Sequence, residues 1–104
     1  MTTVSTHVLD TSSGSPAVGV AVRLESPRGD VLAAEVTGAD GRVPAMTSGR
    51  AGEHRLVLDT GAYFAAHGQP VFYPTVTIAF VPSTEHSHVP VLLSPFGFST
   101  YRGA

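Results

Sequence analysis

The chain has 104 residues, of which six are arginine, none is lysine and eight are acidic, giving a formal net charge of -2. It contains no cysteine, so disulfides, thiolate metal sites and a cysteine nucleophile are excluded. The arginines are scattered rather than clustered, and no apolar run approaches the roughly 20 residues of a membrane span, so neither nucleic acid nor a bilayer is an expected partner.

Short β-prone segments separated by turns follow one another along the chain. Strands are predicted over 4–9, 18–25, 32–36, 53–58, 75–80, 88–93 and 98–102, with turns marked by many of the 11 glycines and 8 prolines. One helix is predicted from Thr60 to about His67, with Asp59 or Thr60 as its N-cap and Gly68 as its left-handed stop. His54, at a strand start, is interpreted as a surface residue. The pattern predicts a single all-β sandwich domain, 1–104, with one short helix.

Strand alternation separates core residues from residues that could form a site. Val4 and Val8 share one face of the first strand, which leaves His7 on the other face. The aliphatic face of segment 88–93 likewise leaves His88 opposite, and Tyr101 lies on the non-core face of the last strand. If these faces adjoin in the folded domain, His7, His88 and Tyr101 converge.

The same outer face also carries apolar side chains. Leu9, Pro90 and Leu92 alternate with the core residues of their strands, and Ser99 shares the non-core face of the last strand. A mixed apolar and polar strip on a small domain is typical of an oligomer contact or a ligand wall. We therefore include Leu92 and Ser99 among the candidate substrate-binding residues.

Two kinds of chemistry fit the histidines. His86 and His88 form a His-x-His pair on a strand, which with His7 could ligate zinc. Alternatively, a neutral imidazole could take a proton from water, while an arginine binds an oxygen-rich substrate and stabilises negative charge on an attacked carbonyl. Arg42, in the turn 40–42, and Arg102, beside Tyr101, are the candidates for that second role.

Several motifs together resemble the 5-hydroxyisourate hydrolases, the enzymatic members of the transthyretin family. The matching segments are STHVLDT at 5–11, DGR at 40–42, DT at 59–60, YF at 63–64, YP at 73–74, HSHVPVLLSPFG at 86–97 and YRG at 101–103. They span almost the whole chain in order. The resemblance implies a transthyretin-like, or prealbumin-like, sandwich of seven to eight strands with one short α-helix, assembled as a homotetramer from two dimers. The N-terminal segment lacks the pattern of a secretory signal, so a cytoplasmic location is expected.

The resemblance also implies an activity and a set of site residues. The activity is hydrolytic opening of the six-membered ring of 5-hydroxyisourate to 2-oxo-4-hydroxy-4-carboxy-5-ureidoimidazoline in urate catabolism, without a metal or organic cofactor. His7, Arg42 and His88 match the catalytic trio. Tyr101, Arg102 and Gly103 match most of the C-terminal signature, in which Tyr101 would close the site over substrate, whereas Arg102 could instead anchor the tail.

Two positions depart from the family pattern, and one rival function remains. Ala104 stands where the signature usually has serine, and Ser87 stands where an aromatic residue is common between the two histidines. The rival is a non-catalytic carrier of small molecules similar to transthyretin. In that branch of the family the catalytic histidines, the arginine and the Tyr-Arg-Gly tail are replaced, whereas this chain retains them, which favours the enzyme.

Overall fold

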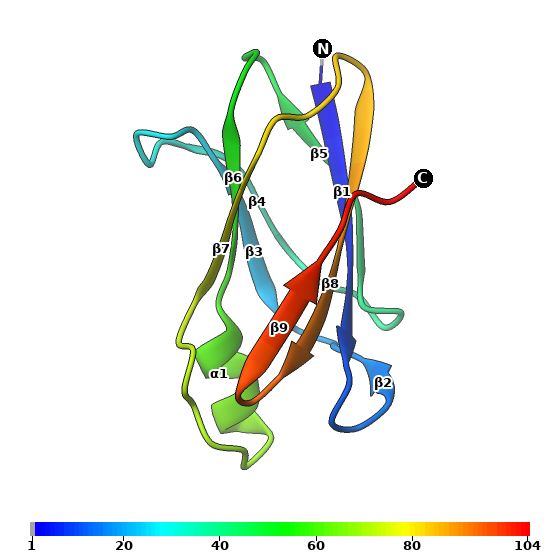
Figure 1. Ribbon diagram of the computed structural model, residues 1–104, viewed down its shortest axis with the longest axis vertical. Coiled ribbons are helices and arrows are strands. Elements are labelled where there is room, and N and C mark those ends of the chain that lie inside the picture. Colours follow the sequence, from blue (N-terminus) through cyan, green and yellow to red (C-terminus); the bar gives the residue numbers. More distant parts are fainter. Residues whose placement is uncertain (1) are drawn as a thin grey trace.

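Two β-sheets pack face to face in a computed structural model that describes residues 2–104 (Figure 1). The first sheet has the strand order β2-β1-β8-β9, with β5 also paired to β1, and the second has the order β4-β3-β6-β7. The strands are β1 (Thr2–Asp10), β2 (Ser15–Pro16), β3 (Ala21–Glu25), β4 (Val31–Val36), β5 (Arg42–Ser48), β6 (His54–Leu58), β7 (Val76–Phe80), β8 (His86–Ser94) and β9 (Gly97–Thr100), and the helix is α1 (Thr60–Ala66). The predicted all-β sandwich with one short helix is confirmed.

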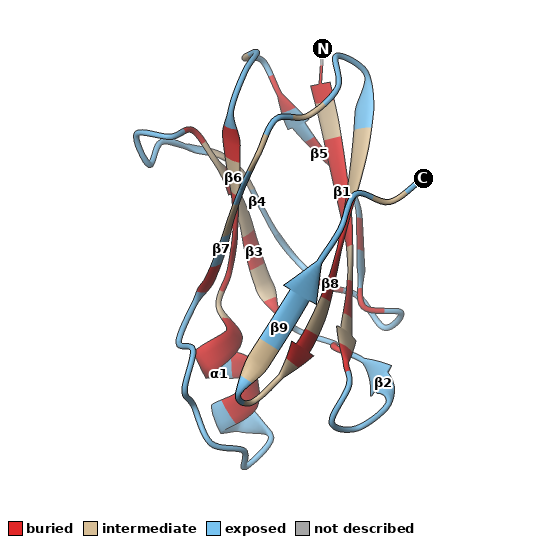
Figure 2. Cartoon of the chain, in the orientation of Figure 1, coloured by how far each residue is buried: buried red, intermediate tan, exposed pale blue. Residues whose placement is uncertain are grey.

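The core lies between the inner faces of the two sheets. Buried residues follow β1, β6 and β8, whereas most of β9 and the tail after it are exposed (Figure 2). Alternation predicts this pattern, since Val4, Val8, Val91 and Leu93 are almost completely buried. Within residues 2–104, no helix is long and apolar enough to span a membrane.

Strand β5 is absent from the sequence-based expectation. The segment contains Pro44 and directly follows a turn, two features that weaken a strand pattern. In the structure β5 lies at the edge of the first sheet and pairs only with β1, where a proline is tolerated. Arg42, expected in the turn, is therefore the first residue of a strand. The position of Arg42 therefore depends on the register of the β1–β5 pair as well as on the turn.

Two other boundary differences affect the path of the chain. β3 starts at Ala21 rather than at position 18, because Gly19 adopts a φ of 81° in the preceding turn. β9 ends at Thr100, so Tyr101 and Arg102 lie beyond the sheet. The tail then continues alongside β8, where the Gly103 N–H donates to the His88 carbonyl at 2.8 Å. Strand alternation consequently does not set the direction of the Tyr101 side chain.

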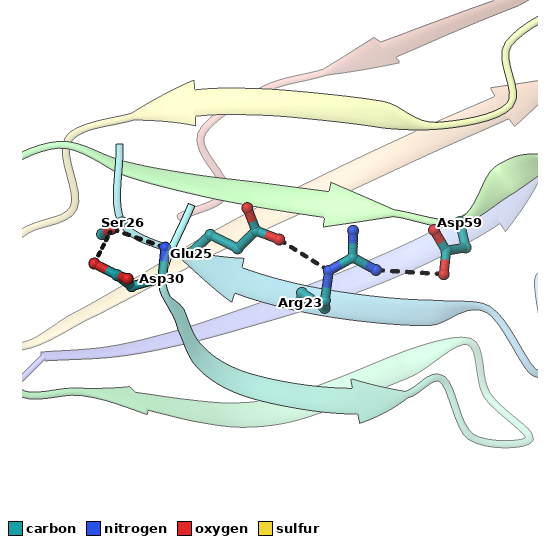
Figure 3. Close-up of polar contacts among 5 residues, drawn as sticks. All are labelled: Arg23, Glu25, Ser26, Asp30 and Asp59. Atoms are coloured by element: carbon teal, nitrogen blue, oxygen red, sulfur yellow. Dashed lines mark hydrogen bonds and ion pairs between the residues drawn. The ribbon is translucent and has the colours of Figure 1, made fainter. Parts of the chain in front are cut away.

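The helix is confirmed with its predicted start at Thr60, but the predicted side-chain cap is not formed. The left-handed stop at Gly68 is present, with a φ of 67°. Asp59 occupies the N-cap position but its side chain makes no capping hydrogen bond. Its carboxylate instead pairs with Arg23 at 3.4 Å, and Arg23 also binds Glu25 at 2.8 Å (Figure 3). The Asp59 side chain thus ties the helix start to β3 rather than capping the helix.

His54 was predicted to be a surface residue, and this is wrong. The side chain is fully buried at the start of β6. Its Nδ1 donates to the Gly52 carbonyl at 2.8 Å, and its Nε2 lies 2.7 Å from the Ser48 hydroxyl. Both polar ring atoms are therefore satisfied, which is the condition for burying an imidazole at low cost. His54 joins the end of β5 to β6 across the domain.

A buried hydrogen bond joins the helix to the end of β1. The Tyr63 hydroxyl donates to Asp10 Oδ2 at 2.7 Å, while Oδ1 of the same carboxylate accepts from Ser12 and Ser13. Burial, the hydrogen bond and the negative charge of Asp10 raise the pKa of Tyr63 to about 12. Burial alone would raise the pKa of Asp10, but the hydrogen bonds from Ser12, Tyr63 and Ser13 outweigh it and lower that pKa.

Tyr63→Phe is expected to lower the free energy of unfolding at neutral pH by about 1.5–3 kcal/mol, because it removes a buried hydrogen bond to a charged group. The loss should shrink in acid, since the stability that ionised Asp10 contributes disappears as the pH falls through its lowered pKa. Urea unfolding at fixed protein concentration measures both effects. Tyr73→Phe, which changes a more exposed tyrosine, is the matched control; equal losses in the two variants would contradict the assignment.

Candidate active site

Three neighbouring strands bring His7, Arg42 and His88 to the outer face of the first sheet. His7 is opposite Arg42 in the antiparallel β1–β5 pair, and His88 is opposite Ser5 in the parallel β1–β8 pair. Directly paired residues point to the same side of a sheet, as do residues two apart on a strand. Ser5 and His7 on β1 therefore link all three predicted catalytic residues to one surface.

Two adjoining cavities lie over this surface. The smaller has a volume of about 370 Å³, and Ser5, Arg42, His88 and Ala104 are among the residues that line it. The larger has a volume of about 630 Å³ between the tail and the β7–β8 connection, and Tyr101 contributes to its wall. His88 and Ala104 line both cavities. The half-buried imidazole of His88 therefore lies where the two cavities meet.

The surroundings of His88 favour its neutral form. Its pKa is lowered from the ordinary histidine value, first by burial, then by the positive charge of Arg42 and by the neighbouring His7 and His86, against an opposing hydrogen bond with the Ser5 backbone. A neutral imidazole has a lone pair that can accept a proton from water. Among the predicted residues, His88 is therefore the one whose environment is best suited to a general base at neutral pH.

His7 and Arg42 are held by the turn that precedes β5. His7 Nε2 donates to the Asp40 carbonyl at 2.9 Å, which leaves Nδ1 as the acceptor of a neutral ring. The backbone N–H of Arg42 donates to Asp40 Oδ1 at 3.0 Å, while its guanidinium Nε lies 3.9 Å from Oδ2. The Arg42 side chain is half exposed. Its cationic end therefore remains available to an anionic ligand.

The C-terminal tail covers the His88 ring through a glycine. A Cβ added at Gly103 would lie 2.6 Å from His88 Cδ2 and 3.1 Å from Cγ, closer than carbon atoms approach. Tyr101 and Arg102 are exposed and border the larger cavity with Gly103. The structure thus places all three residues of the predicted tail motif at the site, with Gly103 in direct contact with the imidazole.

Leu92 and Ser99 lie on the same face but farther along the sheet. They are directly paired between β8 and β9. Leu92 is four residues from His88, a separation of about 13 Å along a strand. Within residues 2–104, neither side chain borders the two cavities. Their contact with substrate remains a prediction.

His86, the other member of the His-x-His pair, is engaged in hydrogen bonds. Its Nε2 lies 2.9 Å from the Ser5 hydroxyl, and its Nδ1 lies 2.6 Å from the Thr3 hydroxyl. The alternative zinc site would need His7, His86 and His88 to converge, but residues 2–104 contain no group of three His, Asp or Glu side chains arranged to hold a metal ion. Sequence reasoning did not identify Ser5 or Thr3 as site residues, although alternation puts both on the His7 face.

The chain is similar along its whole length to proteins of one family. A family model described as HIUase/Transthyretin family matches residues 4–103. The chain is 42% identical to the 5-hydroxyisourate hydrolase of Mesorhizobium japonicum, with 97% of this chain and 91% of that protein covered. It matches the structure of Klebsiella pneumoniae 5-hydroxyisourate hydrolase with a TM-score of 0.91 and 44% identity over 100% of both chains. Sea bream transthyretin in complex with thyroxine matches with a TM-score of 0.87 and 28% identity, over 97% of this chain and 94% of that one. Sequence and fold together place this chain in the HIUase/Transthyretin family.

Proposed function

We propose that this protein is a hydrolase that opens the six-membered ring of 5-hydroxyisourate. The observation that carries the proposal is that His7, Arg42 and His88 share one face of the first sheet, where Arg42 and His88 line the smaller cavity beside the tail. The curated relatives that match this chain over nearly its full length carry the name 5-hydroxyisourate hydrolase. An imidazole beside a guanidinium can supply the general base and the oxyanion stabilisation that acyl hydrolysis uses, whereas a carrier needs only a complementary pocket.

The reaction breaks a cyclic amide bond. Water adds to the ring carbonyl carbon, the resulting tetrahedral centre expels the ring nitrogen, and the product carries a carboxylate and a ureido group. The proton that the attacking water loses returns to the departing nitrogen, so one group can act first as base and then as acid. No redox step is involved, and the mechanism needs no cofactor.

His88 is the proposed general base and Arg42 the proposed electrostatic catalyst. Burial and the nearby positive charge of Arg42 favour neutral His88, which can take the water proton at Nε2. Arg42 lines the smaller cavity with His88 and is free to bind the anionic substrate and the oxyanion that develops on the attacked carbonyl. The carbonyl is expected to bind between these two groups.

His7 and the tail complete the proposed site. His7, on the same face as His88 and opposite Arg42, helps to orient the attacking water through the ring nitrogen that does not bond to Asp40. Tyr101 closes the larger cavity over substrate, and Arg102 either contacts substrate or holds the tail in place. Gly103 keeps the tail against the His88 ring.

We further propose that the active unit is a homotetramer, a dimer of dimers, with the site in the channel where dimers meet. Leu9 and Leu92 are directly paired on the outer face and only half buried in one protomer, which supports a covering partner. Assembly would also bring a second subunit toward the region of Leu92 and Ser99. Light scattering of the purified protein measures the subunit number directly.

The function is tested by following the ultraviolet absorbance of 5-hydroxyisourate freshly made by urate oxidase. The protein is expected to accelerate the decay of that absorbance in proportion to its concentration, including after dialysis against a chelator. Decay at the spontaneous rate would refute the hydrolase, and thyroxine binding by the same preparation would then favour the carrier. Activity lost to the chelator and restored by metal would refute the metal-free mechanism.

Gly103→Ala is expected to lower kcat by about 10- to 100-fold, because the new methyl group must displace either the tail or the His88 ring, and ångström-scale misplacement has effects of this size. Gly97→Ala is the matched control, since a Cβ there meets only Ser94 Oγ at 3.6 Å. Steady-state kinetics compares the two variants. Equal activity of Gly103→Ala and wild type would show that contact between tail and imidazole is dispensable.

A further inference from the structure

A row of hydrogen bonds leads from His88 to the end of the sheet. The Ser5 hydroxyl lies 2.7 Å from His88 Nδ1 and 2.9 Å from His86 Nε2, so it bridges the two rings. The Thr3 hydroxyl lies 2.6 Å from His86 Nδ1 and donates to the Glu85 carbonyl over a longer distance of 3.4 Å. The parallel β1–β8 register, in which Thr3 faces His86 and Ser5 faces His88, produces this alternation of hydroxyl and imidazole.

The chemistry of the bridging groups gives the row a single direction. A serine hydroxyl has one hydrogen, so Ser5 can donate to only one of the two rings and must accept from the other when both are neutral. The carbonyl at the far end can only accept, so the Thr3 hydroxyl donates to it and accepts from His86 Nδ1–H. His86 Nε2 then accepts from Ser5, and Ser5 accepts from His88 Nδ1–H.

We propose that Ser5 and His86 are positioning residues for catalysis: through the Ser5 hydroxyl they hold His88 in the tautomer that carries its proton on Nδ1 and presents the Nε2 lone pair to the reacting water. The proposal rests on the hydrolase function argued above. Ser5 and His86 border the cavities, but in this scheme neither acts on the reacting atoms. Their effect on the reaction passes entirely through the orientation and protonation of the His88 ring.

Burial along the row fits this role. Ser5 is buried, His88 is half buried and His86 is exposed, so the hydroxyl that sets the tautomer is shielded from competing water while the end of the row is solvated. A neutral partner orients the ring without the strong pKa increase that a carboxylate would cause. Like the aspartate of a serine-protease triad, the row fixes the tautomer and orientation of the His88 ring. Unlike that aspartate, it adds no negative charge that would favour the protonated imidazole.

The direct test is the tautomer of His88, read from the imidazole nitrogen chemical shifts of protein labelled with ¹⁵N-histidine. The chain has five histidines, and the His88 signals are identified by their loss in His88→Gln. In the wild type we expect a protonated Nδ1 and an unprotonated Nε2. In Ser5→Ala we expect the Nε2-protonated tautomer to become prominent, because that form is favoured by an imidazole without a partner. An Nε2-protonated ring in the wild type, or an unchanged ring in Ser5→Ala, would overturn the proposal.

Kinetics provides a second readout. Ser5→Ala should lower kcat by about 10- to 100-fold, part of what a general base contributes, with little change in KM. His86→Leu, made at an exposed position that tolerates substitution, should shift the tautomer and lower kcat in the same direction by a smaller factor. Thr47→Ala is the matched control, because Thr47 is exposed and lies opposite Thr3 on the same face. If Ser5→Ala and His86→Leu both matched this control in kcat, the proposed positioning role would be refuted.

The two measurements separate this inference from the proposed function. A wild-type protein without hydrolase activity refutes the proposed function, whereas the nitrogen shifts still decide whether Ser5 sets the tautomer of His88. An active wild type with an unaffected tautomer and kcat in Ser5→Ala refutes the positioning role alone. Loss of kcat together with the tautomer change supports both.

Discussion

His88→Gln is expected to lower kcat for 5-hydroxyisourate hydrolysis by about 100- to 10,000-fold, the range that general-base catalysis contributes. Glutamine can still donate a hydrogen bond to Ser5 and accept one from water, but it cannot take a proton at neutral pH. KM should change much less, because Arg42 and the tail still bind the substrate. Stopped-flow or steady-state absorbance kinetics with freshly made substrate measures both parameters.

His67→Gln is the matched control for this variant. It makes the same chemical change at an exposed histidine that follows the helix, where the ring bonds to the Tyr63 carbonyl. Circular dichroism and light scattering should show that both variants keep the fold and the assembly of the wild type. A folded and assembled His88→Gln protein with wild-type kcat would eliminate the role assigned to His88, while leaving the hydrolase function standing.

Much of the sandwich can be predicted from local patterns. Alternation of apolar residues in β1 and β8 identifies Val4, Val8 and Val91 as core, because one face of each strand packs against the second sheet. The helix is also readable, since Gly68 stops it in the left-handed conformation. These features depend on residues that are close in sequence, and the sequence therefore contains the evidence for them.

Features that depend on strand register could not be predicted in the same way. β5 contains Pro44 and is not among the strands predicted from the sequence, yet its register with β1 puts Arg42 directly opposite His7. The bridge from Ser5 to His88 joins residues 83 positions apart and exists only because β1 and β8 are parallel neighbours in one particular register. The sequence indicates which face each residue occupies, but not which residues on that face are neighbours.

The choice between enzyme and carrier also depends on the site rather than on the fold. Sea bream transthyretin in complex with thyroxine and Klebsiella pneumoniae 5-hydroxyisourate hydrolase both match this chain with TM-scores above 0.85. The fold is therefore compatible with either function. Retention of His7, Arg42 and His88 on one face, with Gly103 packed against the imidazole, distinguishes the proposed hydrolase from a pocket that only binds.

Arg42→Gln is expected to lower kcat by about 100- to 1,000-fold, the cost of losing one preorganised group that stabilises an oxyanion. It should also move the acid limb of the kcat/KM profile to higher pH. The positive charge of Arg42 is one cause, after burial, of the lowered pKa of His88, so removing it raises that pKa toward the ordinary histidine value and the base becomes protonated at a higher pH. Arg42→Lys separates the two effects, because it keeps the charge but loses the paired geometry of the guanidinium. It should lower kcat while leaving the acid limb near its wild-type position. An acid limb that stays in place in Arg42→Gln would show that the charge of Arg42 does not act on His88.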